Sequence, residues 1–456
     1  SFNCHLLYNT FYFIMSQIIK LYITLGGKLM WANESIFYQI YPLGFCCDYS
    51  NNIYEKITKV IDWIPHIKSI GANAIYFSPV FESDNHGYDT KDYFKIDSRI
   101  GTNEDFSKVC KELHNNNIKI VLDGVFNHVG RGFWAFQDVL KNKENSLYKD
   151  WFIINFSGNS NYNDGFWYEG WEGHFELVKL NLKNEQVIEH IFSAIKSWIS
   201  EFNIDGLRLD VAYCLDPEFM KKLRKFCDNL KSDFFLAGEI LFGDYNSIVN
   251  DEMLHSCTNY ECYKGLFSSF NDLNMFEISY SLNRQFGPDE WSIYKNKHLI
   301  CFADNHDVTR IASILKEKKH LSLVYALLFT MPAIPLIYYG SEWGIVGKKE
   351  NGDNSLRPFF KKPIENDLTE FISKFSKIHK NSKAICYGQY KNVMVTNKQL
   401  IFERSLEDEH IIVAINADNT DYTLNINKKG TSLLNGNLID NGYILPAYSV
   451  ECFKCQ

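Results

Sequence analysis

Eight short apolar runs, most of them separated by amphipathic stretches, constrain the fold of this chain more than any other feature. The stretches between them, such as 54–70, repeat apolar residues at three- and four-residue spacing, which is the period of an α-helix. Eight strand-then-helix units in succession favour a (β/α)8 TIM barrel over a doubly wound open sheet. The predicted strands are 35–45, 73–81, 118–126, 204–212, 234–241, 257–262, 299–307 and 334–340.

Two segments depart from this alternation. Residues 129–180 are rich in Trp, Tyr, Asn and Gly with little helical period, and a loop of this length in a compact domain is usually functional. From about residue 383, short alternating strands with Asn-Gly and Asn-Lys turns predict a small antiparallel β domain. We therefore expect a barrel at 30–128 and 181–382, a loop-rich insertion at 129–180, and a C-terminal antiparallel β-sandwich at 383–456.

Residues 1–29 are expected to be a translated leader outside the native fold. The apolar run 6–25 suggests a signal or membrane anchor, but polar residues interrupt it and no A-x-A-like cleavage site follows. The stretch "LGGKLM" at 25–30 is what a ribosome-binding sequence would encode if it were read through before a start codon. We therefore expect the native protein to begin at Met30.

Composition narrows the class of partner. The net charge is −8 and no basic run occurs, which argues against a nucleic-acid partner. The twelve cysteines lack metal-ligand spacing and are typical of reduced thiols in a cytoplasmic protein without a membrane partner. Aromatic residues make up 16% of the chain, which fits either core packing or a cleft whose rings stack on sugars or other planar ligands.

Polar residues close four of the predicted strands. In a barrel of this kind the chemistry takes place at the carboxyl ends of the strands, so these side chains are expected at one mouth. Carboxylates, imidazoles and a guanidinium would meet there. The third strand supplies Asp123, Asn127 and His128; the fourth Asp205, Arg208 and Asp210; the fifth Glu239; and the seventh Asp304, Asn305, His306 and Asp307.

The fourth strand carries two aspartates with different expected roles. Side chains alternate along a strand, so Arg208 and Asp210 share a face with Gly206, whereas Asp205 lies on the other. Arg208 can hold the carboxylate of Asp210 ionised, and an ionised carboxylate in a cleft can act as a nucleophile. Asp205 is interpreted as structural, with a partner that the sequence does not reveal. An isolated Arg-x-Asp pair on a strand is, however, more often a structural ion pair.

Glu239 on the neighbouring strand supplies a second carboxyl group that could serve as a general acid. Retaining glycoside hydrolysis requires such a pair, about 5 Å apart, with a covalent glycosyl intermediate. Asp307 is a third carboxylate, and His128 and His306 could donate to sugar hydroxyls. The remaining single histidines are interpreted as surface or core residues: His66, His114, His174 and His190.

Four ordered motifs resemble the signatures of the α-amylase family, glycoside hydrolase family 13. They are "DGVFNH" (123–128), "DGLRLDVA" (205–212), "GEIL" (238–241) and "FADNHD" (302–307), and the resemblance extends over residues 31–456. The stretch "LVKLN" (177–181) is similar to one in the neopullulanase, cyclomaltodextrinase and maltodextrin-hydrolase group. The sequence contains no counterpart of the amino-terminal β domain usual in that group.

The resemblance implies a role for individual residues. Asp210 would be the nucleophile, Glu239 the acid/base and Asp307 the stabiliser of the reacting sugar. The remaining implied site residues would orient Asp210 (Arg208), bind the same sugar (His128 and His306), stack beneath it (Tyr88) or line the donor side (Asp353 and Arg357). The insertion 129–180 would be the family's domain B and form the other wall of the cleft.

The resemblance also implies a partner and an activity. The substrate would be an oligosaccharide or α-glucan, hydrolysed at α-1,4 bonds of maltodextrins or starch fragments by a monomer or weak homodimer. No cofactor is expected to be required. Many relatives carry a Lys-His pair where this chain has Tyr213 and Cys214, so calcium near Asn127 is possible but not expected to be necessary. Glucanotransferase activity, α-1,6 cleavage and a non-catalytic relative are the alternatives, and the last would require loss of Asp210 or Glu239.

Overall fold

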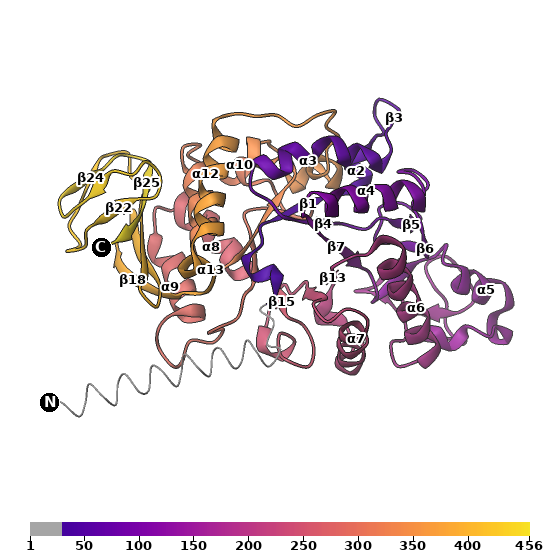
Figure 1. Cartoon of the computed structure of the whole chain (residues 1–456). Coiled ribbons are helices and arrows are strands. Elements are labelled where there is room, and N and C mark those ends of the chain that lie inside the picture. The colour runs from indigo at the N-terminus through magenta and orange to yellow at the C-terminus, as the bar shows by residue number, and fades with distance from the viewer. Residues whose placement is uncertain (1–29) are drawn as a thin grey trace.

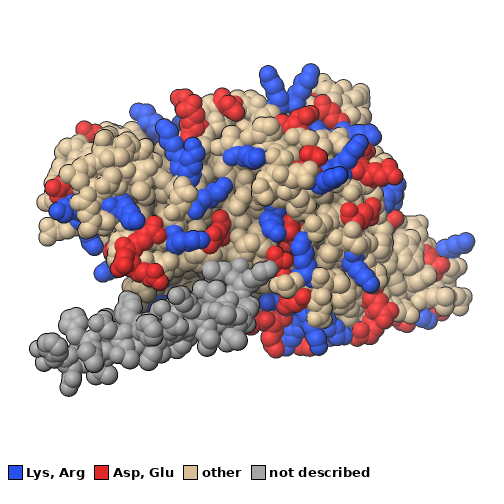
Figure 2. Space-filling model, viewed as in Figure 1, with Lys and Arg blue, Asp and Glu red and all other residues tan. Residues whose placement is uncertain are grey.

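The computed structural model describes residues 30–456. The predicted leader and the apolar run 6–25 lie outside the described residues. Within 30–456, no helix is both long enough and apolar enough to cross a bilayer. On the face drawn in Figure 2, basic and acidic side chains are intermixed over the described surface.

Eight parallel strands form a closed barrel at the centre of the molecule (Figure 1). Their order in the sheet is β15-β14-β13-β7-β4-β1-β17-β16, and a parallel bridge from Thr258 to Ile300 joins the two outer strands. This arrangement confirms the predicted (β/α)8 barrel. The strands are β1 (Phe37–Ile40), β4 (Ala74–Phe77), β7 (Lys119–Gly124), β13 (Gly206–Leu209), β14 (Phe235–Gly238), β15 (Ser256–Cys257), β16 (Ile300–Phe302) and β17 (Ile334–Tyr338).

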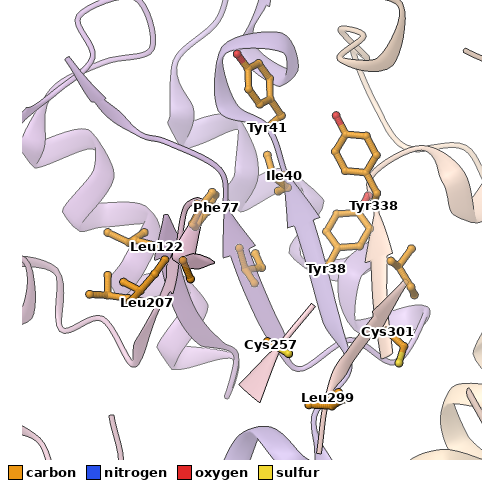
Figure 3. Close-up of a cluster of buried hydrophobic side chains, with 14 of the residues drawn as sticks. Tyr38, Ile40, Tyr41, Phe77, Leu122, Leu207, Cys257, Leu299, Cys301 and Tyr338 are labelled. Carbon is orange, nitrogen blue, oxygen red and sulfur yellow. The ribbon is translucent and has the colours of Figure 1, made fainter. Parts of the chain in front are cut away.

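The barrel strands are buried on both faces, as parallel strands covered by helices must be. One set of alternate residues packs against the surrounding helices; Figure 3 shows part of this layer, with Ile40, Phe77, Leu122 and Leu207. The other set fills the barrel interior with residues such as Phe37. Apolar side chains therefore occupy the interior, and the polar residues that follow the strands are left at its carboxyl end.

Helices cover the outside of the barrel, and several begin at the side-chain caps that the sequence indicates. Thr102 and Asp105 form a reciprocal capping box at the start of α4, and Asp216 caps α7 ahead of Pro217. The helices are α3 (Val60–Ser69), α4 (Asn103–Asn115), α6 (Glu185–Phe202), α7 (Pro217–Leu230), α8 (Tyr260–Asn271), α9 (Met275–Phe286), α10 (Ile311–Ile314), α11 (His320–Thr330), α12 (Asp367–Asn381) and α13 (Lys383–Tyr387).

Two predicted strands are shorter than expected. The run 35–45 contains β1 and then the short helix α2 (Pro42–Cys46), because Pro42 pre-sets the first turn of a helix. The run 257–262 contains the end of β15 and the start of α8, which Asn259 caps with its side chain. After α2 comes the hairpin of β2 (Cys47–Asp48) and β3 (Ile53–Tyr54), and after β4 the pair β5 (Phe81–Ser83) and β6 (Thr90–Ile96).

The insertion after β7 contains more regular structure than its sequence predicts. It includes a helix, α5 (Trp134–Asn142), which the low helical period did not indicate. A three-stranded sheet joins β8 (His128–Gly130), β12 (His174–Lys179) and β11 (Gly170–Trp171), and β9 (Ile154–Asn155) pairs with β10 (Trp167–Tyr168). Val129 pairs with Val178, so the two ends of the insertion lie side by side.

The C-terminal segment is antiparallel, as predicted. Its larger sheet contains β18 (Gln389–Val395), β19 (Gln399–Leu406), β20 (Glu409–Asn416), β25 (Ser449–Cys455), β22 (Gly430–Ser432) and β23 (Leu438–Ile439). The smaller sheet pairs β21 (Tyr422–Leu424) with β24 (Tyr443–Leu445). Apolar side chains from both sheets, such as Ile412 and Leu424, form one buried cluster.

Candidate active site

A cleft of about 620 Å³ opens at the carboxyl ends of the barrel strands and is walled on one side by the insertion. Of the nine residues to which the resemblance assigns a role, all line the cleft except Arg208 and His306, which contact the lining residues from inside the barrel. The lining residues are His86, Tyr88, His128, Trp171, His174, Glu176, Leu177, Asp210, Val211, Tyr213, Glu239, Leu241, Tyr260, Asp307, Val308, Lys349, Asp353 and Arg357.

Arg208 lies at the centre of the carboxylates. Its Nη1 donates to Asp210 Oδ1 at 2.8 Å and to Asp123 Oδ1 at 2.9 Å, and its Nη2 is 2.9 Å from Glu239 Oε1. The strand register places these groups together, because Arg208 on β13 pairs with Asp123 on β7. Asp210 and Glu239, the two residues predicted to do the chemistry, therefore contact the same guanidinium.

One buried cation thus serves three buried carboxyl groups. Burial raises the pKa of Asp210 well above its ordinary value; Arg208 opposes this shift, and Glu239 and Asp123 add to it. This differs from the prediction that Arg208 keeps Asp210 ionised, because the arginine is shared rather than paired with Asp210 alone. Asp210 therefore binds its proton more tightly than a free aspartate does.

The strained backbone of Val211 directs a further hydrogen-bond donor, its own N–H, toward Glu239. Val211 has φ 40° and ψ 48°, a left-handed conformation that is an outlier for a β-branched residue. In this conformation its backbone N–H donates to Glu239 Oε2 at 3.0 Å. Because Arg208 holds the other oxygen, both oxygens of Glu239 have fixed partners.

His306 has a defined tautomer. Gln39 Nε2, which can only donate, lies 2.8 Å from His306 Nδ1, so Nδ1 is the acceptor and Nε2 carries the hydrogen. That Nε2 is 2.9 Å from Asp307 Oδ2 and 2.5 Å from the hydroxyl of Tyr88, whose ring stacks on the imidazole at 5.4 Å. The Tyr88 hydroxyl donates in turn to Asp123 Oδ2 at 3.0 Å.

Asp307 is held from both sides and faces the cleft. His306 contacts one oxygen, and Arg357 Nη2 donates to the other at 2.9 Å. These neighbours lower the pKa of Asp307 below its ordinary value, although burial opposes the shift. Arg357 also donates to the His306 carbonyl and lies 3.4 Å from Asp353, the other predicted donor-side residue, so it connects Asp353 to Asp307.

The insertion contributes aromatic and imidazole groups to the opposite wall. His128 Nδ1 accepts from Asn127 Nδ2 at 3.2 Å, which leaves a buried Nε2–H without a partner. Burial lowers the pKa of His128 to about 3, so the ring is a neutral donor at ordinary pH. Trp171 lies 5.9 Å from this ring, and His174, which was interpreted as a surface or core residue, lines the cleft as well.

Sequence reasoning missed several lining residues. Trp171 comes from the aromatic-rich insertion, and that composition was the only signal for it. Tyr260 was hidden because the sixth run appeared to be strand through residue 262. The contact of Asp123 with Arg208 depends on the pairing of β13 with β7, which the sequence does not specify.

Asp205 lies at the other end of β13, and its side chain has a different set of partners from that of Asp210. Its side chain accepts from Lys119 and Lys231 at 3.0 and 2.8 Å, and lies 2.8 Å from His114 Nε2. It also accepts from the Ile120 backbone N–H. These contacts lower its pKa below the ordinary value against the effect of burial. They supply the structural partners that the sequence did not identify.

Within residues 30–456, no group of three or more His, Cys, Asp or Glu side chains could hold a metal ion. Asn127 Oδ1 is buried without a hydrogen-bond partner, and Tyr213 directs its hydroxyl toward Glu172 at 3.4 Å. That the protein requires no metal stays a prediction.

Comparison with known proteins adds three findings. The family model described as "Alpha amylase, catalytic domain" matches residues 39–384. Alpha-amylase 2 from Dictyoglomus thermophilum is 32% identical over 92% of this chain and 76% of its own length, and a cyclomaltodextrinase from a Bacillus species is 29% identical over 86% and 74%. The ligand-free structure of cyclic α-maltosyl-(1→6)-maltose hydrolase from Arthrobacter globiformis superposes with a TM-score of 0.81. It has 26% identity and covers 94% of this chain and 100% of that one.

Proposed function

The chain belongs to the α-amylase family of glycoside hydrolases, and from this premise we propose that it cleaves α-1,4-glucosidic bonds of maltodextrins with retention of configuration. The observation that carries the proposal is the contact of Asp210 and Glu239 with one guanidinium, at the floor of a cleft that Asp307 also faces. Contact of both carboxyl groups with one side chain supports their assignment as a retaining pair, whose members lie about 5 Å apart.

The proposed reaction has two displacements. The carboxylate of Asp210 attacks the anomeric carbon while Glu239 donates its proton to the departing glycosidic oxygen. Glu239 then removes a proton from water, whose oxygen attacks the same carbon and releases Asp210. The proposed first step requires that Asp210 is ionised and that Glu239 carries a proton when the glucan is bound.

The remaining predicted residues would hold the reacting sugar. The free Nε2–H of His128 supports a hydrogen bond to a hydroxyl, since the neutral ring can donate there at any pH well above 3. Asp307 would accept from two hydroxyls of the same ring, and the stacked pair of Tyr88 and His306 would form the apolar platform beneath it. Trp171 supports contact with the glucan from the insertion side.

Product analysis from maltoheptaose tests this proposal. Early NMR spectra of the products should show shorter maltooligosaccharides with the α-anomeric configuration, and Asp210→Asn should release none. β-Anomeric products would overturn retention. Products longer than seven glucose units would make the protein chiefly a glucanotransferase, in which a sugar rather than water takes the glycosyl group from Asp210.

A second candidate is cleavage of α-1,6 bonds. The similarity to a hydrolase named for an α-maltosyl-(1→6)-maltose ring favours this candidate. Release of maltose from panose or of maltotriose from pullulan, at a rate comparable to maltoheptaose cleavage, would support it. The relative kcat/KM values on matched α-1,4 and α-1,6 oligosaccharides separate the two.

Several earlier expectations stay proposals. We propose that 30–128 and 181–382 form the catalytic barrel, 129–180 domain B and 383–456 the C-terminal domain. We also propose a monomer or weak homodimer in the cytoplasm with no nucleic-acid or membrane partner. All eleven cysteines within the described residues are free thiols, which supports the proposed location.

A further inference from the structure

A second cavity lies at the opposite end of the barrel from the candidate active site. It has a volume of about 200 Å³, and its lining comes from the segments before β16 and β17, the end of α9, and the turn from α13 into β18. Its lining residues are Phe286, Gly287, Lys295, Asn296, Lys297, His298, Pro332, Ala333, Cys386, Tyr387, Gly388, Gln389 and Arg404. This lining includes three formal cations and no Asp or Glu from the described part of the chain, although the whole chain carries a net charge of −8.

Arg404 is the most constrained of these cations. Its side chain is 1% exposed, its Nη1 and Nη2 donate to the carbonyls of Thr330 and Gly388 at 2.9 Å each, and its Nε–H has no partner. Within residues 30–456, no carboxylate lies within 4.0 Å of the guanidinium. Thr330 ends α11, so the helix dipole offsets part of the charge. Burial nevertheless lowers the pKa of Arg404 to about 10.

The other buried arginines have acidic neighbours. Arg208 contacts three carboxylates, and Arg357 contacts Asp307 and Asp353. Arg310, which is as buried as Arg404, donates to Ser341 Oγ, and that hydroxyl contacts both oxygens of Asp304. A buried charge without a counter-charge lowers the stability of the folded protein. A bound anion beside Arg404 would supply the missing counter-charge.

The two lysines of the lining, Lys295 and Lys297, also form no ion pair with a carboxylate among residues 30–456. Lys295 donates to the Pro288 carbonyl and Lys297 to the Val249 carbonyl, so each ammonium keeps two further donors. The nearby carboxylate of Glu34 is occupied by Lys383 and by the hydroxyl of Tyr387. The lining therefore offers donors and positive charge without a competing carboxylate from residues 30–456.

We propose that this cavity binds a small oxyanion of the phosphate class, either inorganic phosphate or the phosphate group of a sugar monoester. Guanidinium and ammonium groups are the side chains that recognise phosphate oxygens. The volume exceeds the roughly 30 Å³ that one water occupies in the liquid, so an anion of this size can enter. The site is separate from the proposed glucan cleft and does not depend on that proposal.

Calorimetric titration of the protein with sodium phosphate, at ionic strength held constant with chloride, tests the site. We expect one saturable site and a rise in the unfolding midpoint that follows the same affinity. Lys295→Ala and Lys297→Ala should each weaken the Kd about tenfold. The matched control Lys391→Ala removes an exposed lysine of β18 and should leave the Kd unchanged.

In the Arg404→Met variant, phosphate should no longer raise the unfolding midpoint. If this variant does not fold, the affinities of Lys295→Ala and Lys297→Ala test the proposal instead. Glucose 6-phosphate binding at least tenfold more tightly than phosphate would identify a sugar monoester as the ligand, whereas equal or weaker binding would identify inorganic phosphate. The absence of saturable binding, or equal affinity in the wild type and both lysine variants, would overturn the proposal.

Discussion

The two ends of strand β13 carry buried aspartates in opposite electrostatic surroundings. At the amino-terminal end, two lysines, a histidine and a backbone N–H surround Asp205, and its pKa is lowered. At the carboxyl end, Asp210 shares a single arginine with Asp123 and Glu239, and its pKa is raised. The residues are only five positions apart.

This difference separates a stabilising aspartate from a reactive one. A carboxylate with several cationic partners, such as Asp205, favours the folded state. Its lowered pKa keeps it ionised, so it does not exchange a proton near neutral pH. A carboxyl group in a cluster with too few cations reduces stability, but it can change its protonation state when a ligand binds. Substitutions at the two ends should therefore have opposite effects on activity and stability.

Asp210→Asn should give the largest effect. Turnover of maltoheptaose should fall about 10⁴-fold or more, because the amide cannot attack the anomeric carbon. The raised pKa means that the folded protein binds this proton more tightly than the unfolded chain, so Asp210 reduces stability increasingly as the pH rises above about 4. The variant should unfold at least about 2 °C higher than wild type at pH 8, with a smaller gain at pH 4. Product release from maltoheptaose measures the loss of turnover, and thermal unfolding measures the change in midpoint. The control is Asp251→Asn, which changes an exposed aspartate. An unfolding midpoint below that of wild type at pH 8 would contradict the proposed difference between Asp210 and Asp205.

Glu239→Gln should follow, with a loss of about 10²- to 10⁴-fold on maltoheptaose. The amide cannot protonate the leaving oxygen, so the loss should be much smaller in the first step on an aryl maltoside whose phenol leaves without protonation. Burst kinetics with such a substrate checks this. An equal loss on both substrates would assign Glu239 a structural role like that of Asp205.

Asp205→Asn should leave kcat within about twofold of wild type and lower the free energy of unfolding by about 2–3 kcal/mol at pH 7, because charge-assisted hydrogen bonds are lost. The lowered pKa makes this contribution complete above about pH 4, the range of an unfolded aspartate, and it is lost as the pH falls through the folded pKa. Denaturant unfolding should therefore show a smaller difference from wild type at pH 3 than at pH 7. A penalty that grows on acidification would refute the assignment.

Lys231→Met should give the smallest effect, about 1 kcal/mol of stability with unchanged activity. Its ammonium contacts Asp205 and the Ile204 carbonyl, but its side chain is partly exposed and Asp205 keeps two other cationic partners. The control is Lys225→Met, an exposed lysine of α7 with no ion pair among the described residues. Equal stability of the two variants would show that Lys119 and His114 alone are sufficient to stabilise the buried carboxylate of Asp205.

The sequence predicted the barrel and the residues at its mouth because both follow from local patterns. Strand runs and the helical period between them are visible over ten to twenty residues, and a parallel barrel places every strand end at one face. Asp210, Glu239 and Asp307 could be grouped on that basis without any knowledge of distances.

What the sequence could not supply depends on register and on contacts between distant segments. The partners of Asp205 come from α4, from β7 and from the residue after α7, and no local pattern connects them. The sharing of Arg208 follows from the pairing of β13 with β7, and the left-handed backbone of Val211 could not be expected for a β-branched residue. Helix α5 was missed because it is short and lies in a segment whose remaining residues, rich in Trp, Tyr, Asn and Gly, have little helical period.

The pairing of Val129 with Val178 brings the two ends of the insertion together, so the segment between them forms a loop that starts and finishes at the same place on the barrel. Its two ends leave the barrel as neighbouring strands, so the segment between them can be lengthened, shortened or exchanged without opening the barrel. Trp171 and His174 lie within that segment, whereas the three carboxyl groups of the proposed reaction lie outside it. Recombination at these two positions would therefore replace one wall of the cleft as a unit. Substrate preference can in this way evolve separately from bond-cleaving chemistry.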